Sequence, residues 1–404
     1  MYEQALYIKS PLFVERVRYD ATAEEMHIHL GVQKGAKFNC PECNETDCAT
    51  AGSVDRTWRC MDFFGHKAYI HLKTPRIKCT NCGTHVFVPP WTRKHSSFTL
   101  LFEAYVIEMA RNMPITAIAK IVREHDTRLW RIIGAHVGKA YHEKDMSKVA
   151  KIGIDETSTK RGHNYITCAY DIEKSEVLHA AEGKKTENIE LFIKELRKHN
   201  GKPENISHVS IDMAKAFIKG VRDYLPKAEV TFDKFHVIQH AGKAVDQVRR
   251  SETKKNPTLK GTRYIWLKNP ENLTEEQKKS LNTLSKENKD LARAYQEKQT
   301  LQDIYRNIRD PETAEFAFTK FCDWAQRSRL TPMVKLGELI KKHWKGIINY
   351  FKTGSHSAVC EGINSKIQLI KKRSRGFRNI KNFINMIYLE GSNLTLPAWS
   401  CNTK

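Results

Sequence analysis

The sequence lacks any long apolar run. Nowhere in its 404 residues does a hydrophobic stretch approach the roughly 20 residues that a membrane-spanning helix needs. Its first residues, MYEQALYIKSPLF, lack the apolar core of a secretory signal peptide, and the chain contains no internal repeat. These absences argue against a membrane, secreted or repeat protein, and they favour a chain that works inside the cell.

Acidic residues are scarce relative to basic ones. Lys and Arg number 68 against 46 Asp and Glu, a formal net charge of +22. Such an excess favours a polyanionic partner, and without a membrane-spanning segment the expected partner is nucleic acid. The chain is 40% hydrophobic and long enough to form two to four domains, each with its own core.

Disulfide bonds are not expected, because a long, basic chain of this kind does not need them and four of its ten cysteines form two CxxC pairs. The pairs are Cys40 with Cys43 and Cys79 with Cys82, and four thiolates suit tetrahedral zinc. A shell of four cysteines leaves no open position for chemistry, so residues 1–95 are predicted to hold a structural Zn²⁺. Scattered buried cysteines are the alternative. Four possible substitute ligands are left out of the predicted set: Cys48, Cys60, His66 and His71.

Residues 96–147 show three short amphipathic patterns typical of a helix-turn-helix domain. The expected inward stripes are Leu101, Phe102, Tyr105, Val106 and Met109, then Ile115, Ile118, Ala119 and Val122, then Leu129, Ile132, Ile133 and Val137. This leaves Thr127, Arg128 and Arg131 outward at the start of the third helix, where a recognition helix contacts DNA. A structural three-helix bundle is the alternative.

Three short β-rich segments within residues 148–250 each end in an aspartate, namely Asp155, Asp212 and Asp233. Side chains alternate along a strand, so each aspartate points away from the apolar residue before it. The expected order is three strands, helix, strand, helix, strand. A ribonuclease H-like sheet needs this order, and the predicted fold is therefore α/β with a ribonuclease H-like catalytic domain. A strand-end aspartate taken alone is more often a cap or turn residue.

A further carboxylate is expected on a later helix. Residues 251–353, rich in Lys, Glu, Gln and Asn, are predicted to form a helical insertion, and residues 354–395 to complete the catalytic domain. One face of the later helix is predicted to carry Val359, Ile363, Lys366, Ile367 and Ile370, with Glu361 opposite, beside Asn364, Gln368 and Lys372. Five nearby basic residues are expected DNA contacts, although a solvated surface is their ordinary interpretation: Lys371, Lys372, Arg373, Arg375 and Arg378.

With these motifs the chain resembles, over nearly its whole length, the DDE transposases of bacterial insertion sequences, specifically the ISL-three family. Ile154-Asp155-Glu156 is similar to the first family signature and Asp212 to the second acid. The segment Cys360-Glu361-Gly362-Ile363-Asn364, with the basic run after it, is similar to the third signature, although a different small or aliphatic residue is expected at Cys360. Asp233-Lys234-Phe235-His236 resembles the acid-x-x-His element of related groups.

The resemblance implies DNA strand cleavage and strand transfer with two Mg²⁺ (or Mn²⁺) ions held by Asp155, Asp212 and Glu361. His236 would orient a strand or shuttle a proton, and Asp233 is the rival for the second acid. The implied partners are the terminal inverted repeats and target DNA, with a homo-oligomer assembled on DNA and no membrane. The implied location is the bacterial cytoplasm, on the chromosome.

Two other classes of protein stay open. A transcription regulator built from the zinc module and the helix-turn-helix would explain the first 145 residues but would leave the acids without a role. A ribonuclease H-fold nuclease would use the acids without joining DNA. Strand transfer separates these classes, because only a transposase has to join the excised ends to new DNA.

Overall fold

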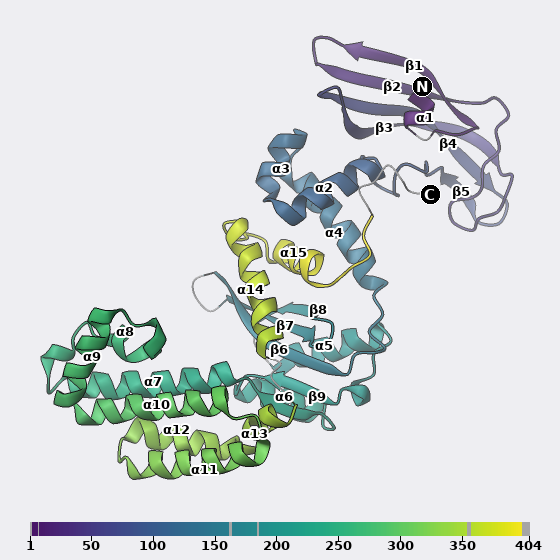
Figure 1. Ribbon diagram of the computed structural model, residues 1–404. Helices are drawn as coiled ribbons and strands as arrows, with labels where there is room; N and C mark the ends of the chain where they lie inside the picture. Colours follow the sequence, from purple (N-terminus) through teal and green to yellow (C-terminus); the bar gives the residue numbers. More distant parts are fainter. Residues whose placement is uncertain (1, 7, 161–163, 184–185, 354–356, 398–404) are drawn as a thin grey trace. The chain divides into compact units, whose positions relative to one another are not determined.

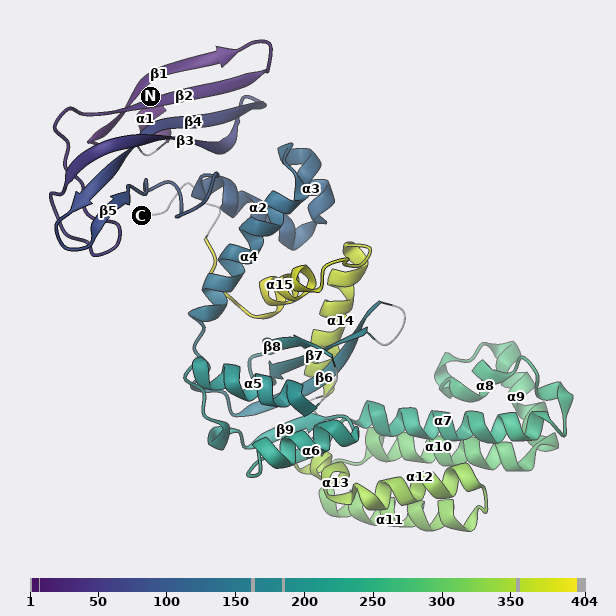
Figure 2. The same ribbon diagram turned by 180° about the vertical axis from the view of Figure 1, so that it is seen from behind.

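The computed structural model describes residues 2–6, 8–160, 164–183, 186–353 and 357–397 (Figures 1 and 2). The chain forms two compact units, one up to Tyr141 together with the residues from Leu394 onward, the other from His142 to Asn393. Among the described helices, none combines the length and the apolar character needed to cross a membrane.

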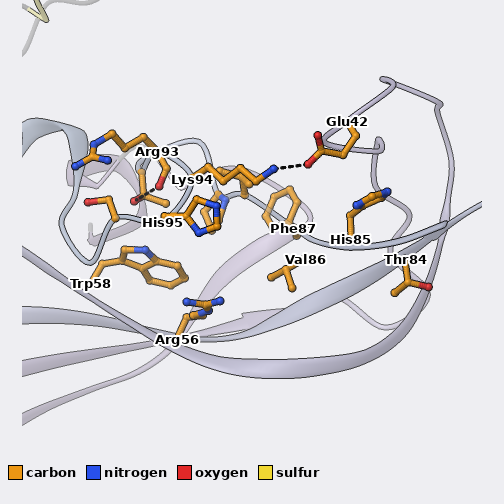
Figure 3. Close-up of a pocket in the computed structure, with 14 residues that line it drawn as sticks. Glu42, Arg56, Trp58, Thr84, His85, Val86, Phe87, Arg93, Lys94 and His95 are labelled. Carbon is orange, nitrogen blue, oxygen red and sulfur yellow. Dashed lines mark hydrogen bonds and ion pairs between the residues drawn. The ribbon is translucent and has the colours of Figure 1, made fainter. Parts of the chain in front are cut away.

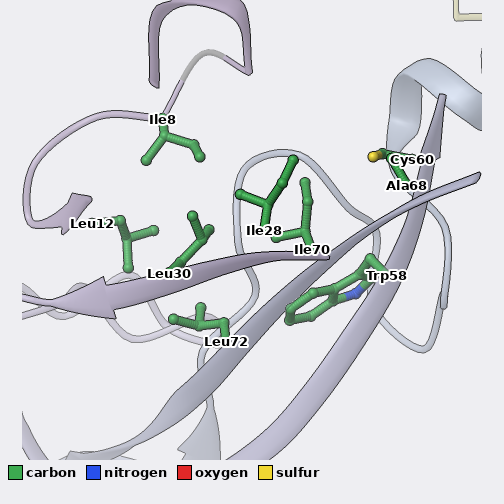
Figure 4. Close-up of a cluster of buried hydrophobic side chains, with 9 residues drawn as sticks. All are labelled: Ile8, Leu12, Ile28, Leu30, Trp58, Cys60, Ala68, Ile70 and Leu72. Carbon is green, nitrogen blue, oxygen red and sulfur yellow. The ribbon is translucent and has the colours of Figure 1, made fainter. Parts of the chain in front are cut away.

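The first unit opens with a β-sheet. A short helix, α1 (Tyr2–Ala5), precedes β1 (Leu12–Asp20), β2 (Glu25–Val32), β3 (Ala49–Phe63), β4 (His66–Cys79) and β5 (Gly83–Val86). The strand order is β1-β2-β4-β3, and β5 pairs with β4. Alternate residues of β2 and β4, including Ile28, Leu30, Ile70 and Leu72, are buried around Trp58 in one apolar core (Figure 4). Strand alternation therefore gives this sheet one apolar face.

Three helices follow the sheet in the first unit: α2 (Leu100–Asn112), α3 (Ile115–Val122) and α4 (Asp126–His142). The hydroxyl of Thr99 caps α2 by accepting a hydrogen bond from the Phe102 N–H. Most of the predicted inward residues are buried, and Tyr105 and Ala119 are half-buried. The prediction for Leu101 is wrong: it is 37% exposed, because it lies about 100° around the helix from Phe102.

A buried cluster of charges joins the sheet to these helices. Arg59 on β3 is 1% exposed and forms ion pairs with Asp62 and with Glu124, which lies in the turn between α3 and α4. Its guanidinium also lies 5.4 Å from the centre of the Phe102 ring on α2. The segments predicted to bind zinc and DNA therefore lie in one compact unit.

The second unit is built on a mixed five-stranded sheet. In chain order it contains β6 (Lys151–Lys160), β7 (Asn164–Asp171), β8 (Glu176–Glu182), α5 (Thr186–Lys198), the short 3₁₀ turn η1 (Pro203–Asn205), β9 (His208–Ile211), α6 (Lys215–Tyr224) and β10 (Glu229–Phe232). The strand order is β10-β9-β6-β7-β8. Strands β6, β9 and β10 are parallel to one another, whereas β7 pairs antiparallel with β6 and β8. The predicted sequence of strands and helices is confirmed.

One strand boundary differs from the prediction. Asp212 and Asp233 directly follow β9 and β10 as expected, but Asp155 does not end its strand. Strand β6 continues to Lys160, because its hairpin with β7 extends as far as the pair of Lys160 with Asn164. Asp155 therefore lies within a strand, directly opposite the buried Cys168 of β7.

Residues 234–353 are helical in this unit, with 3₁₀ turns η2 (Pro257–Leu259) and η3 (Pro270–Asn272) between longer helices. These are α7 (Lys234–Thr253), α8 (Arg263–Leu267), α9 (Glu275–Glu287), α10 (Lys289–Asn307), α11 (Pro311–Arg327), α12 (Thr331–Lys342) and α13 (Trp344–Thr353). Helix α7 crosses the predicted boundary at residue 250 without a break, and α10 and α12 pack along it. The final helices are α14 (Ser357–Arg373) and α15 (Ile380–Gly391).

A buried carboxylate stabilises the helical part of the first unit. Glu103 on α2 is 0% exposed and accepts hydrogen bonds from Arg93 Nε at 2.9 Å, Ser96 Oγ at 2.6 Å and His136 Nε2 at 2.6 Å. Burial raises the pKa of Glu103, but these three partners outweigh burial and lower the pKa below the ordinary value. Glu103 thus fastens both α4 and the segment before α2 to one helix.

We expect Glu103→Gln to lower the free energy of unfolding of this unit by about 3 kcal/mol, because a broken buried ion pair leaves charges without compensation. Since the folded-state pKa is lowered, the wild-type contribution is present above the unfolded-state pKa and is lost as the pH falls through the folded-state pKa. Hydrogen exchange of the α2 and α4 amides, corrected for the intrinsic rate at each pH, measures both effects.

The control variant is Glu108→Gln on the same helix, whose side chain is 56% exposed. It should change stability by less than about 0.5 kcal/mol. Equal protection in wild type and Glu103→Gln would contradict the assigned role.

Candidate functional site

Four thiols converge in the first unit. Cys40 and Cys43 lie in the loop between β2 and β3, Cys79 ends β4, and Cys82 lies just before β5. The four Sγ atoms lie within 4.8 Å of one another, with 3.4 Å between those of Cys40 and Cys82. Within the described ranges, this is the only such group of three or more His, Cys, Asp or Glu residues. The predicted cysteine set is confirmed as a cluster.

Hydrogen bonds favour the thiolate, the form that binds zinc, at Cys40 and Cys79, whereas neighbouring thiols and burial raise the pKa of Cys43 and Cys82. Burial raises the pKa of Cys79, but the backbone N–H groups of Asn81 and Cys82, with neighbouring thiols, outweigh burial and lower the pKa to about 6. The Asn81 N–H donates to Cys79 Sγ at 3.4 Å. Cys48 lies outside the cluster and directs its thiol to the Glu45 carbonyl oxygen at 3.5 Å. This donor set fits a structural zinc ion.

A pocket of about 270 Å³ extends from Glu42, in the first CxxC turn, to the segment before α2 (Figure 3). Its lining includes Trp58 and the exposed Arg56, and Lys94 forms an ion pair with Glu42 at 2.5 Å across it. Because Glu42 lies inside the first CxxC turn, this ion pair holds that turn against the segment leading to α2.

The predicted DNA-contacting residues of α4 differ in their surroundings. Thr127 and Arg131 are exposed, as expected for a recognition helix. Arg128 forms an ion pair with Glu124, and its guanidinium lies 4.4 Å from the centre of the Phe98 ring. Arg128 therefore fastens the start of α4, whereas Arg131 is the more accessible of the two arginines for a phosphate.

The acids of the second unit meet at one edge of its sheet. The last parallel pairs join Gly153 to Ser210 and Phe232 to Ile211. Continuing this register places Asp155 beside Asp212, and Asp212 beside Asp233. Because residues in register on parallel strands point to the same face, the three carboxylates share one face of the sheet.

The Asp155 carboxylate lies close to side chains from two helices, α7 and α14. Its Oδ2 accepts a hydrogen bond from Asn364 Nδ2 at 2.6 Å, and its Oδ1 lies 3.9 Å from His236 Nε2. Burial, the largest influence, raises the pKa of Asp155, and the charge of Asp212 adds to this, whereas His236 and Asn364 oppose it. The net pKa is raised because burial outweighs these partners and the hydrogen bond from the Glu156 N–H.

Asp212 and Asp233 also take part in local backbone structure. Asp212 Oδ1 accepts a hydrogen bond from the Ala214 N–H at 2.7 Å. Asp233 is the N-cap of α7, and its Oδ1 accepts from the Phe235 N–H at 3.0 Å. Each carboxylate retains a second oxygen for another partner.

Helix α14 supports β6 through a row of polar contacts. Asn364 bonds to Asp155, Gln368 Nε2 donates to Thr157 Oγ1 at 2.6 Å, and Lys371 Nζ donates to the Ser158 carbonyl oxygen at 2.7 Å. Successive helical turns thus contact successive positions along β6, two of them through side chains and the last through a backbone carbonyl. The inward face of this helix is formed by Cys360, Ile363, Ile367 and Ile370. The prediction that Lys366 belongs to that face is wrong, since Cys360 occupies it and Lys366 is exposed.

Glu361 is exposed and lines a groove of about 540 Å³ together with Lys234, Phe235, Arg306 and Arg309. Its carboxylate does not join those of Asp155 and Asp212 within 4.8 Å, in contrast to the cysteines. By the same measure, Asp155, Asp212, Asp233 and His236 form no group of three within 4.8 Å among the described residues. The register aligns the three aspartates, His236 lies 3.9 Å from Asp155, and Glu361 lies one helical turn from Asn364.

The basic run after Glu361 divides into two groups. Lys371 bonds to β6, and Arg373 forms an ion pair with Glu390 on α15. Lys372, Arg375 and Arg378 are exposed. Only the exposed group is readily available to an external phosphate.

Sequence reasoning missed one residue of this site, His240. It lies one turn after His236 on α7, and the charge of Asp212 acts on its imidazole. Burial is the main cause that lowers the pKa of His240, with Lys243 and His236 adding to it. The spacing of four residues between two histidines was the available signal, since it places both on one helix face.

We expect the purified chain to contain one tightly bound zinc per molecule. Replacing Cys40 and Cys79 by Ser should release that zinc and unfold the first unit while leaving the second unit folded, because the binding free energy of a structural zinc is folding free energy. Metal analysis by mass spectrometry and circular dichroism measure the two effects. The control is Cys322→Ser, which changes a buried cysteine of α11 outside the cluster and should leave the bound zinc in place. Wild-type protein without stoichiometric zinc would contradict the prediction.

Comparison with known proteins covers almost the whole chain. Residues 152–387 match a family model described as a transposase, residues 88–137 the helix-turn-helix domain of transposase family ISL3, and residues 36–82 the zinc-finger of transposase IS204/IS1001/IS1096/IS1165. The transposase for insertion sequence element IS1557 of Mycobacterium tuberculosis is 30% identical over 382 residues, which cover 86% of this chain and 84% of that protein. The transposase for insertion sequence element IS1001 of Bordetella parapertussis is 24% identical over 353 residues, covering 85% and 86%.

The three matched regions coincide with the cysteine cluster, with α2 to α4, and with the sheet and helices that carry the acids. The transposase model alone spans more than half of the chain. This protein belongs to the ISL3 family of transposases.

Proposed function

We propose that this transposase cuts and joins DNA at the ends of an insertion sequence, through a DDE site on a ribonuclease H-like domain. The observation that carries the proposal is the register of β6 with β9, which aligns Asp155 with Asp212 at one edge of the sheet. The strand order β10-β9-β6-β7-β8, with helices between the parallel strands, is the arrangement that a ribonuclease H-like sheet needs.

Asp155, Asp212 and Glu361 would hold two Mg²⁺ (or Mn²⁺) ions, since hard cations prefer carboxylate oxygens. When bound, these ions supply activation of the attacking oxygen and stabilisation of charge on the phosphate. The fit rests on the donor set: Asp155 lies within β6, Asp212 directly follows the neighbouring strand β9, and both are half-buried. Asn364 holds the Asp155 carboxylate in a fixed orientation, and His236 lies close enough to move a proton or to position a DNA strand.

Two features favour Asp212 over Asp233 as the second acid. Strand β9 is the direct neighbour of β6, whereas β10 is one strand farther away. Asp233 is also the N-cap of a helix of 20 residues, so its carboxylate already has a structural role at the start of α7, whereas the N-cap of α6 is Ala214 and not Asp212. Asp233 is therefore assigned a positioning role at the start of α7, beside His236.

The groove that contains Glu361 supports a path for DNA past the acids. A second groove, of about 660 Å³, continues along α7 and shares Phe235, Ile238, Asn269 and Gln302 with the first. Lys234 and Arg309 give the first groove positive charge, and Lys372, Arg375 and Arg378 are exposed on the segment after Glu361. Cations along a groove suit a phosphate backbone. Terminal repeats and target DNA are the proposed partners, with a homo-oligomer assembled on them.

We expect Asp155→Ala, Asp212→Ala and Glu361→Ala each to reduce cleavage of the element's own ends by at least about 10³-fold, since several kcal/mol of charge stabilisation would be lost. Binding to those ends should survive, because ion coordination and helix-turn-helix docking involve different residues. A sequencing gel of end-labelled DNA incubated with Mg²⁺ measures cleavage and strand transfer.

The matched control is Asp233→Asn, which keeps an N-cap side chain but removes the carboxylate. Its cleavage rate should stay within about tenfold of wild type. Full activity of Glu361→Ala would place the third acid elsewhere, and cleavage by wild type without joined products would indicate a nuclease instead of a transposase.

We expect Arg131→Ala to weaken binding to the ends and to reduce the salt dependence of binding by about one unit of log-log slope, the effect of one lost phosphate contact. Arg128→Ala should weaken binding as well, but together with a lower melting temperature of the first unit, because Arg128 is fastened to Glu124 and Phe98. Fluorescence anisotropy at several salt concentrations and calorimetry separate the two variants. Unchanged binding in both would refute the recognition-helix assignment.

A further inference from the structure

The hairpin that joins β3 to β4 has an unusual residue at its tip. Phe63 and His66 form its last pair, so Phe64 and Gly65 make a two-residue turn. Both have positive φ, 50° at Phe64 and 81° at Gly65. Turns of this kind favour Asn-Gly or Asp-Gly, and positive φ in a bulky residue is an outlier that costs stability. At the first position of this turn, Phe is therefore less favourable than Asn or Asp.

The Phe64 side chain contributes little to the core. It is 88% exposed, more than any other large hydrophobic residue in the described part of the chain. Its ring packs edge-on against the ring of its neighbour Phe63, with ring centroids 4.7 Å apart. A lone exposed aromatic ring needs no explanation, but one kept in a strained backbone conformation motivates a functional contact as the reason for the residue.

The hairpin tip is fixed to the turn that leads into α4. Arg123, in that turn, donates from Nη2 to Asp62 Oδ2 at 2.6 Å and to the Gly65 carbonyl oxygen at 2.8 Å. Arg59 forms an ion pair with the same Asp62. The acidic residue nearest the tip is thus neutralised by two arginines, and the tip has a defined position relative to the start of α4.

We infer that Phe64 is an apolar wedge that enters the minor groove of the element's end while α4 occupies the adjacent major groove. The inference rests on the proposed function of α4. The phenyl ring is thin enough to enter a groove about 6 Å wide, whereas the two-stranded ribbon that carries it would stay outside the groove. Phenylalanine is among the residues that insert between base steps from the minor groove and kink the duplex. Neutralisation of Asp62 removes the repulsion that a carboxylate would meet from phosphates.

The test compares Phe64→Asn with Phe64→Leu in the full chain. Asn suits the turn, so Phe64→Asn should melt no lower than wild type, yet its affinity for a duplex carrying the element's end should fall about tenfold, the scale of one lost base-step contact. Leu keeps an apolar wedge in the same strained conformation, so Phe64→Leu should stay within about threefold of wild-type affinity. In a circular-permutation gel assay, wild type and Phe64→Leu should bend the duplex, and Phe64→Asn should not.

The matched control is Phe316→Ala, which removes a 64% exposed phenylalanine from α11 in the second unit and should change neither affinity nor bending. Wild-type affinity and bending in Phe64→Asn, with weakened binding in Arg131→Ala, would overturn the inference and leave the role of α4 intact. If Phe64→Asn lost its oligomeric state in sedimentation but kept wild-type DNA affinity, the inference would also be overturned, and Phe64 would be shown to contact protein. Wild-type protein that does not prefer the element's end would refute both the inference and the proposed role of α4.

Discussion

The parallel pairing of β6 with β9 is the constraint on which the candidate active site depends. It joins segments that lie more than 50 residues apart in the chain and sets Asp155 and Asp212 side by side. A shift of one residue in this register would turn one of the two carboxylates to the opposite face of the sheet. The remaining elements of the second unit can be understood as supports for this edge.

Two helices from distant parts of the chain provide that support. Helix α14 contacts β6 through Asn364, Gln368 and Lys371, so the strand keeps its position beyond the point where β9 ends. Helix α7, capped by Asp233, holds His236 3.9 Å from Asp155, and His240 follows one turn later on the same helix. Burial raises the pKa of Asp155, and repulsion from the charge of Asp212 adds a smaller contribution. Helices anchored at several points can hold such charges in place.

The first unit uses buried charge in a different way. Arg59 connects the sheet to the helix-turn-helix, and Glu103 connects α2 to α4 and to the segment after the zinc module. Removing one partner of a buried pair costs far more than removing a surface pair. The cysteine cluster, the hairpin tip and the start of α4 are therefore parts of one body, so the two-part contact with an element's end that we propose would have a defined geometry.

The sequence alone determined the features that depend on neighbours along the chain. The CxxC pairs, the apolar stripes of α2 to α4, the order of strands and helices, and the aspartates after β9 and β10 all follow from local spacing. Tertiary pairing decided the rest. Pairing with β7 extends β6 beyond Asp155. Packing of α14 directs Asn364 toward Asp155 and places Glu361 in a groove. Contacts with Phe98 and Glu124 hold the Arg128 side chain against the protein surface. These outcomes depend on contacts between residues that are far apart in the sequence, and the local periodicity of the chain does not predict such contacts.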